Sequence, residues 1–119
     1  MNIAQYEYPG LHPEIVETTG AYFSMKKDFN NALNWYGQLL TIKPNDPFVL
    51  YNIARSYAQS GKMKDAWQYL SLSMQAGFRY GYVLDEDNAW ASYRKDVRWK
   101  DLRKKYADKK YAEPVQFNN

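Results

Sequence analysis

The chain of 119 residues contains no cysteine and only one histidine, and both facts narrow its chemistry. Without cysteine it can form no disulfide, no thiolate nucleophile and no zinc-thiolate centre. The histidine, His12, stands beside Pro13, and the local sequence places no serine, carboxylate or second metal ligand in a catalytic arrangement with it. We therefore expect His12 at the surface, and we predict a chain without catalytic residues, metal site or cofactor.

Long apolar runs and phosphate-binding loops are missing as well. No apolar run is long enough to cross a bilayer, and the amino terminus lacks the basic start and apolar centre of a signal peptide. We expect no membrane insertion and a cytoplasmic location by default. There is no glycine-rich phosphate loop. The acidic run at Asp85, Glu86 and Asp87 lacks the spaced ligands of a calcium loop, so we expect these acids to cap the short helix carrying Trp90.

What the chain does contain is a repeat with a period of 34 residues. Residues 13–46 and 47–80 carry similar residue types at matching offsets. The matching pairs are Gly20 and Ala54, Phe23 and Tyr57, Ala32 and Ala66, and Tyr36 and Leu70. A fixed period of this length is typical of stacked copies of one small unit. Such proteins usually hold partners and do not transform substrates.

Each copy is predicted to consist of two antiparallel helices. In the second copy, apolar residues recur at intervals of three and four between positions 50 and 57 and again between 63 and 74. Gly61 separates the two stretches and can take the left-handed conformation that ends a helix, whereas the first copy has Lys27 at that point. The small residues at positions 20, 32, 54 and 66 mark places where helix backbones approach closely. The predicted fold class is all-α.

This unit resembles the tetratricopeptide repeat (TPR), a helix-turn-helix unit with small and aromatic residues at these offsets and a closing proline. Pro44 closes the first copy, and Asp46 is expected to cap the helix that opens at Pro47. Phe78 replaces the closing proline of the second copy. The resemblance covers roughly two thirds of the chain. It implies a short right-handed α-α superhelix with C-terminal capping helices.

From Leu84 onward the chain resembles the tail that commonly closes bacterial arrays of this repeat. The matching residues are Asp87, Trp90, Tyr93, Arg94, Asp96, Arg98, Trp99 and Leu102, with Val97 where proline is usual. A tail of this kind closes the apolar end of a stack. The residues expected to cover the second repeat are Trp90, Tyr93, Trp99, Leu102 and Tyr106, with Lys100, Arg103, Lys104 and Lys105 facing water. The predicted organisation is an N-terminal extension (1–12), two repeats (13–46 and 47–80), a degenerate third repeat (81–110) and a mobile tail (111–119).

The resemblance also implies a partner-binding groove, because in this family the first helix of each repeat lines a concave surface. Carried over to this chain, the groove residues are Glu14, Glu17, Ala21, Ser24, Met25, Phe48, Tyr51, Asn52, Arg55, Gln59 and Tyr82, with Asp85 and Ala89 as an extension. Phe48 and Tyr51 are expected to be apolar anchors, and Arg55 can grip a carboxylate through two parallel hydrogen bonds. In the competing interpretation these aromatic residues are covered by residues 5–11 of the same chain.

One subgroup of the family holds acidic chaperone tails with a clamp of lysine, asparagine and arginine. The equivalent positions here are Glu17, Ala21, Asp85 and Ala89. Because these residues cannot form the clamp, we expect no binding to such tails.

The formal net charge of +3 conceals a local excess of basic residues. Residues 1–93 carry seven basic and nine acidic side chains, whereas residues 94–110 carry nine basic and three acidic ones. We interpret this excess first as the solvated face of a terminal helix, where the helix dipole favours basic residues. The alternative is a basic strip that docks an acidic protein or nucleic acid, formed by Arg98, Arg103, Lys104 and Lys105. Nucleic acid is the weaker option, because two of the interleaved aromatic residues fit core spacing.

The sequence thus predicts a non-catalytic module for protein–protein interaction: a scaffold, an adaptor or a small subunit of a larger assembly, with a protein or peptide partner. Two alternatives stay open, an accessory TPR region of a bacterial multidomain enzyme and a basic adaptor. The helix expected at residues 13–25 has no polar capping unit before it, so pairing of two copies into a homodimer is open as well.

Overall fold

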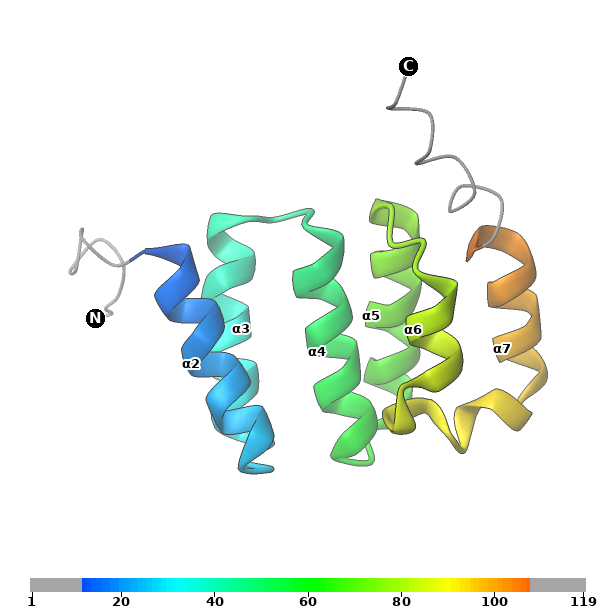
Figure 1. Cartoon of the computed structure of the whole chain (residues 1–119), viewed down its shortest axis with the longest axis horizontal. Helices are drawn as coiled ribbons and strands as arrows, with labels where there is room; N and C mark the ends of the chain where they lie inside the picture. The colour runs from blue at the N-terminus through cyan, green and yellow to red at the C-terminus, as the bar shows by residue number, and fades with distance from the viewer. Residues whose placement is uncertain (1–11, 108–119) are drawn as a thin grey trace, which may run out of the picture. The chain divides into compact units, whose positions relative to one another are not determined.

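The computed structural model describes residues 12–107, and this part of the chain is helical, with no strand in it (Figure 1). The helices are α2 (Pro13–Met25), α3 (Phe29–Ile42), α4 (Pro47–Gln59), α5 (Met63–Ala76), α6 (Gly81–Glu86) and α7 (Val97–Leu102). The shorter turns are η1 (Asn88–Trp90), η2 (Tyr93–Lys95) and the π-helical η3 (Arg103–Ala107). The predicted all-α class is confirmed.

The chain divides into two compact units, Met1–Pro44 and Asn45–Asn119. In the first unit α2 packs against α3, and in the second α4 packs against α5. The α2–α3 hairpin falls inside the predicted repeat at 13–46, and the α4–α5 hairpin inside the repeat at 47–80. Two predictions, the mobile tail at 111–119 and the cover formed by residues 5–11, lie outside the described residues.

The small residue at position 20 is required by the packing of the first unit. A β-carbon added to Gly20 would lie 2.8 Å from Cε1 of Tyr36, inside any normal contact distance. Tyr36 is itself buried, with 4% of its surface exposed, so its ring has little freedom to move aside. Gly20 thus lets α2 pack closely against α3, but the group that needs the space is the Tyr36 ring and not the backbone that the sequence predicted.

The turns that end α2 and α4 have the same hydrogen bonds 34 residues apart, although their residues differ. The amide of Asp28 donates to the carbonyl of Phe23, and the amide of Lys62 donates to that of Tyr57, both at 2.9 Å. This is the six-residue closure of a Schellman turn. The residue before each amide is left-handed: Gly61 has φ 81°, and Lys27 has φ 62°. Lys27 therefore adopts the left-handed conformation that glycine usually provides at this position of the turn.

Aspartates begin most of the later helices. Asp28 caps α3, Asp46 caps α4 and Asp96 caps α7, each accepting from backbone amides of the first turn. Asp87 caps η1 through the amide of Ala89, at 3.0 Å. The predicted roles of Asp46 and Asp87 are confirmed, whereas Asp85 and Glu86, also expected to cap the helix carrying Trp90, are instead the last residues of α6. A carboxylate is favoured there because it satisfies an amide that the helix leaves without a partner.

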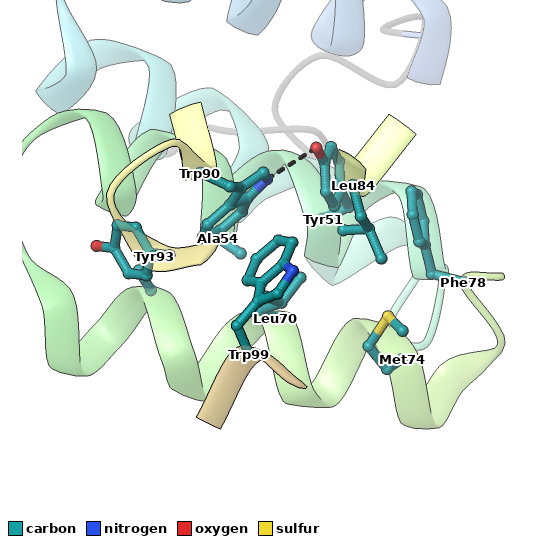
Figure 2. Close-up of a cluster of buried hydrophobic side chains, with 10 residues drawn as sticks. Tyr51, Ala54, Leu70, Met74, Phe78, Leu84, Trp90, Tyr93 and Trp99 are labelled. Carbon is teal, nitrogen blue, oxygen red and sulfur yellow. Dashed lines mark hydrogen bonds between the residues drawn. The ribbon is translucent and has the colours of Figure 1, made fainter. Parts of the chain in front are cut away.

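The core of the second unit joins α4 and α5 to the segment that follows them (Figure 2). Its buried residues are Tyr51, Ala54, Ala66, Leu70, Met74, Phe78, Leu84, Trp90, Tyr93 and Trp99. Leu102 and Tyr106 pack against it. The expected cover of the second repeat by residues 90–106 is therefore present. One expectation is wrong: Arg103 does not face water, because its side chain is 18% exposed and pairs with Asp85.

Candidate interaction surface

The residues expected to line a groove lie on α2, α4 and α6, except Ala89, which lies in η1. Glu14, Glu17 and Met25 are exposed on α2 of the first unit. In the second unit, Phe48, Gln59 and Tyr82 are exposed, Asn52 and Arg55 are half-buried, and Tyr51 is buried. Among the further positions, Ala21 and Asp85 are exposed, and Ser24 and Ala89 are half-buried.

Tyr51 is not the surface anchor that the sequence suggested, because only 6% of it is exposed. Its ring stacks on Phe78, with centroids 4.5 Å apart and planes 10° from parallel. The hydroxyl accepts a hydrogen bond from Nε1 of Trp90 at 2.9 Å (Figure 2). Phe78 stands where the tetratricopeptide repeat has its closing proline, and Trp90 comes from residues 84–106 that follow the second hairpin, which we call the closing segment. These two residues, neither of which belongs to a plain repeat, enclose the Tyr51 ring.

The Tyr51 hydroxyl belongs to a polar cluster around Asp87. It donates to Oδ2 of Asp87 at 2.5 Å, and Nε of Arg55 donates to the same oxygen at 2.7 Å. Arg55 also donates to Oε1 of Gln59 at 3.1 Å. The sequence predicted that Arg55 would grip the carboxylate of a partner, and in the structure it holds Asp87 of the same unit. The cluster ties α4 to the loop between α6 and η1.

The protonation states of Asp87 and Tyr51 indicate that this polar cluster has a structural role. Burial pushes the pKa of Asp87 up, but hydrogen bonds from Arg55, Tyr51 and the Ala89 amide outweigh it, so the pKa lies below its usual range. Burial, reinforced by the hydrogen bond to Asp87, raises the pKa of Tyr51. At neutral pH the cluster therefore holds an ionised carboxylate and a neutral phenol, neither poised to exchange a proton.

Arg94 also holds this loop, through hydrogen bonds to its backbone. Its Nη2 donates to the carbonyls of Leu84, at 2.8 Å, and Asp87, at 2.6 Å. Its guanidinium lies 5.9 Å from the centroid of the Trp99 ring, within cation–π range. The loop that presents Asp87 to α4 is thus held by backbone contacts as well as by its own side chain.

Aromatic side chains gather at the surface next to the polar cluster around Asp87. We call Phe48, Tyr80 and Tyr82 the aromatic patch. Phe48 is 47% exposed and Tyr82 54%, whereas Tyr80 is half-buried between them. The Tyr80 centroid lies 5.4 Å from that of Phe48 and 6.2 Å from that of Tyr82. Beneath them, buried Phe78 contacts both Phe48 and Tyr80 edge-on. The patch therefore rests on rigid packed rings.

The basic strip is partly occupied by internal contacts. Arg98 pairs with Asp96 at 2.8 Å, which lowers the pKa of Asp96 to about 2, and its guanidinium lies 4.6 Å from the Trp67 ring centroid. Arg103 pairs with Asp85. Lys104 and Lys105 are exposed. Two of the four residues, Arg98 and Arg103, are therefore already engaged in contacts within the second unit.

Two contributors to the surface were not identified from the sequence. Tyr80 lies at the junction between the second repeat and α6, where no periodicity marks it. Phe78 was noted as a departure from proline, but its role beneath the patch depends on Tyr51 stacking on it from α4. The available signal was the density of aromatic residues between positions 78 and 82.

No helix within residues 12–107 is both long and apolar enough to cross a membrane. The same residues contain no group of three or more histidine, aspartate or glutamate side chains placed to hold a metal ion.

Comparison of the chain with family models, with curated proteins and with solved structures found no match.

Proposed function

We propose that this chain is a non-catalytic protein-interaction module of the TPR type, which binds a protein or peptide partner through the aromatic patch of its second unit. The 34-residue period, the two hairpins and the equivalent turns at Lys27 and Gly61 support the TPR assignment. The right-handed superhelix remains part of this proposal.

The exposure of the aromatic patch is the observation that carries the proposal. Phe48 and Tyr82 each leave about half of their surface in water, although the same unit buries Phe78, Trp90 and Trp99 almost completely. Aromatic side chains are enriched at the energetic centres of protein interfaces, because they provide large contact area for few rotatable bonds. Since the patch rests on packed rings, a partner would not have to order it, which lowers the entropic cost of binding.

A polar group beside the patch would orient a partner. Asn52 is half-buried on α4 one turn after Phe48. Because hydrogen bonds at the rim of an interface select geometry more than they add affinity, we assign specificity to the Asn52 amide and affinity to the aromatic rings.

Affinity capture with matched variants tests the proposal. The full chain, its Phe48→Ala/Tyr82→Ala variant and a Met63→Ala/Leu72→Ala control are used as baits, and bound proteins are quantified by mass spectrometry. All four side chains are exposed large hydrophobics, so the two variants remove similar apolar surface. We expect a small set of proteins that the patch variant loses and the control keeps.

The partner identified in this way is then purified and titrated. Removing one interface aromatic commonly costs more than about 1 kcal/mol, so the double variant should bind about tenfold or more weakly. If the patch variant retained every partner at unchanged affinity, the patch would not be the binding surface.

A further inference from the structure

A second apolar surface lies on α2 of the first unit, and it is independent of the aromatic patch. Ile15, Tyr22 and Met25 are 49%, 51% and 79% exposed. Within the described part of the first unit, these are the exposed large hydrophobic residues, and all of them belong to this one helix. Exposed Thr18 lies between them. We call Ile15, Thr18, Tyr22 and Met25 the α2 stripe.

The α2 stripe points away from the partner helix α3. Val16 and Gly20 are buried, and Gly20 faces the Tyr36 ring of α3. At 3.6 residues per turn, the centre of the stripe lies about 150° around the helix from the centre of this packed face. α2 therefore has two apolar faces, and the hairpin of the first unit covers one of them.

The other helix of the hairpin differs in this respect. The exposed residues of α3 are polar or lack a side chain: Asn30, Asn31, Asn34, Gly37 and Thr41. Within this hairpin, only α2 carries a line of exposed apolar residues. Contiguous exposed apolar surface on one element commonly marks an interaction site.

The spacing of the α2 stripe identifies what would fit it. Its residues are separated by three, four and three positions, which is the a-d-a-d pattern of a coiled-coil seam. The pattern also reads the same in both directions about position 20. An identical helix running antiparallel would therefore place Ile15 against Met25 of the second copy, and Thr18 against Tyr22 of the second copy.

Charge favours the antiparallel arrangement over the parallel one. Glu14 and Glu17 are near the start of α2, and Lys26 and Lys27 follow its end. Two antiparallel copies bring the acidic start of each helix level with the basic end of the other, and their helix dipoles oppose. Two parallel copies would place like charges at the same level.

From these observations we infer that two copies of this chain associate through the α2 stripe, as an antiparallel pair of α2 helices with two-fold symmetry. α2 is already folded against α3, so pairing does not require the helix to form. A single helix of 13 residues gives a small interface, and the dimer is accordingly a weak one.

Sedimentation equilibrium of the full chain is the first test, over concentrations from about 10 to about 500 µM, a range suited to a small interface. The average mass should rise with concentration toward twice that of one chain. A strictly monomeric chain across this range would overturn the inference, leaving another occupant for the α2 stripe, such as residues 1–11 or a different protein.

Charge variants within the seam test the pairing. Ile15→Lys and Met25→Glu should each lower the association constant about tenfold or more, because a charge then faces an apolar residue. Combined in one chain, the two substitutions place the introduced lysine opposite the introduced glutamate of the second copy and should recover most of the association. Val97→Glu changes a residue that is 68% exposed in the second unit, so this control should associate as the native chain does.

Unchanged association of both single variants would exclude the α2 stripe as the interface. A double variant that associates less than either single one would exclude the antiparallel pairing, because parallel helices place lysine against lysine and glutamate against glutamate. Circular dichroism of each variant verifies that the helices remain folded.

Cysteine pairs test the register directly, since the native chain has no cysteine to interfere. The Ile15→Cys/Met25→Cys variant should form disulfide-linked dimers under mild oxidation. Ile15→Cys alone should not, because the two cysteines would lie about 15 Å apart along the helix axis, beyond disulfide reach. Efficient cross-linking of the single variant would overturn the proposed register.

Discussion

The side chain of Asp87 contributes to the second unit through each of its oxygens. Oδ1 caps η1 by accepting from the Ala89 amide, and Oδ2 accepts from Tyr51 and Arg55 of α4. The side chain is only 10% exposed, so water screens these contacts weakly. One carboxylate therefore caps η1 and also binds the loop before η1 to α4.

We predict that Asp87→Asn lowers the free energy of unfolding at neutral pH by about 1–2 kcal/mol, less than for a fully buried pair because Arg55 is one-third exposed. The folded-state pKa of Asp87 lies below its usual value, so its stabilising contribution is present above about pH 4 and disappears as the pH falls through the folded pKa. Urea denaturation at pH 7, 4, 3 and 2.5 measures this. The gap between native chain and variant should narrow with acid.

Glu86→Gln is the control for this prediction, because Glu86 is an exposed acid next to Asp87. It should leave both stability and its pH dependence nearly unchanged. A gap between the native chain and Asp87→Asn that stayed constant from pH 7 to 2.5 would show that the ionised carboxylate is not what stabilises the loop.

Two glycines of the first unit should respond to alanine with opposite signs. Gly20→Ala places a methyl group 2.8 Å from buried Tyr36, and we expect a loss of about 1–3 kcal/mol. Gly37 lies in α3 with no atom within 4 Å of an added β-carbon, so Gly37→Ala should gain about 0.5–1 kcal/mol of helix propensity. Thermal and chemical denaturation of both variants compares them. Equal effects would contradict the close approach of α2 to α3.

At the scale of the helices, the two hairpins form the same turn with different residues. Each first helix must end and reverse within three residues, and both do so through the same Schellman hydrogen bonds. The left-handed residue is Gly61 in one hairpin and Lys27 in the other. Glycine takes this conformation without steric cost, whereas a lysine β-carbon meets the neighbouring carbonyl oxygen.

We predict that Lys27→Gly stabilises the chain by about 0.5–1 kcal/mol and that Gly61→Ala destabilises it by about 1 kcal/mol. Neither substitution alters a packed side chain, because Lys27 is exposed and Gly61 has open space around it. The midpoints of thermal unfolding should shift in opposite directions. A destabilised Lys27→Gly variant would show that the lysine side chain contributes more than its backbone strain takes away.

At the scale of the whole molecule, the second unit is incomplete without the segment that follows its hairpin. Leu84, Trp90 and Trp99 from this segment are each at most 5% exposed and pack with Ala54, Leu70 and Met74 of α4 and α5. Removing the segment would expose a large apolar surface to water, and burial of such surface is the main driving force of folding.

We therefore predict that a chain ending at residue 80 loses the cooperative unfolding of its second unit. The measurement is the near-ultraviolet circular dichroism of the aromatic residues, together with the thermal transition. A chain ending at residue 107 retains every described core residue and should keep the transition of the full chain. A sharp native-like transition in the shorter chain would contradict the dependence of α4 and α5 on the closing segment.

The local features were predictable from the sequence because they depend on neighbouring residues. Helix periodicity, the cap at Asp46, the turn at Gly61 and the close approach at Gly20 each follow from residue types a few positions apart. The covering role of Trp90 and Trp99 was predictable from the resemblance to closing tails, because such tails cover the apolar end of a stack.

The contacts between distant residues were decided by the tertiary structure. Position 51 has the spacing of a surface-facing residue on α4, yet Phe78 and Trp90, 27 and 39 positions away, enclose its ring. Arg55 was identified as a carboxylate binder, but only the folded unit shows that Asp87 occupies it. Spacing along a helix tells which side chains share a face, and only the packing of other segments determines whether that face meets water, a carboxylate or an aromatic ring.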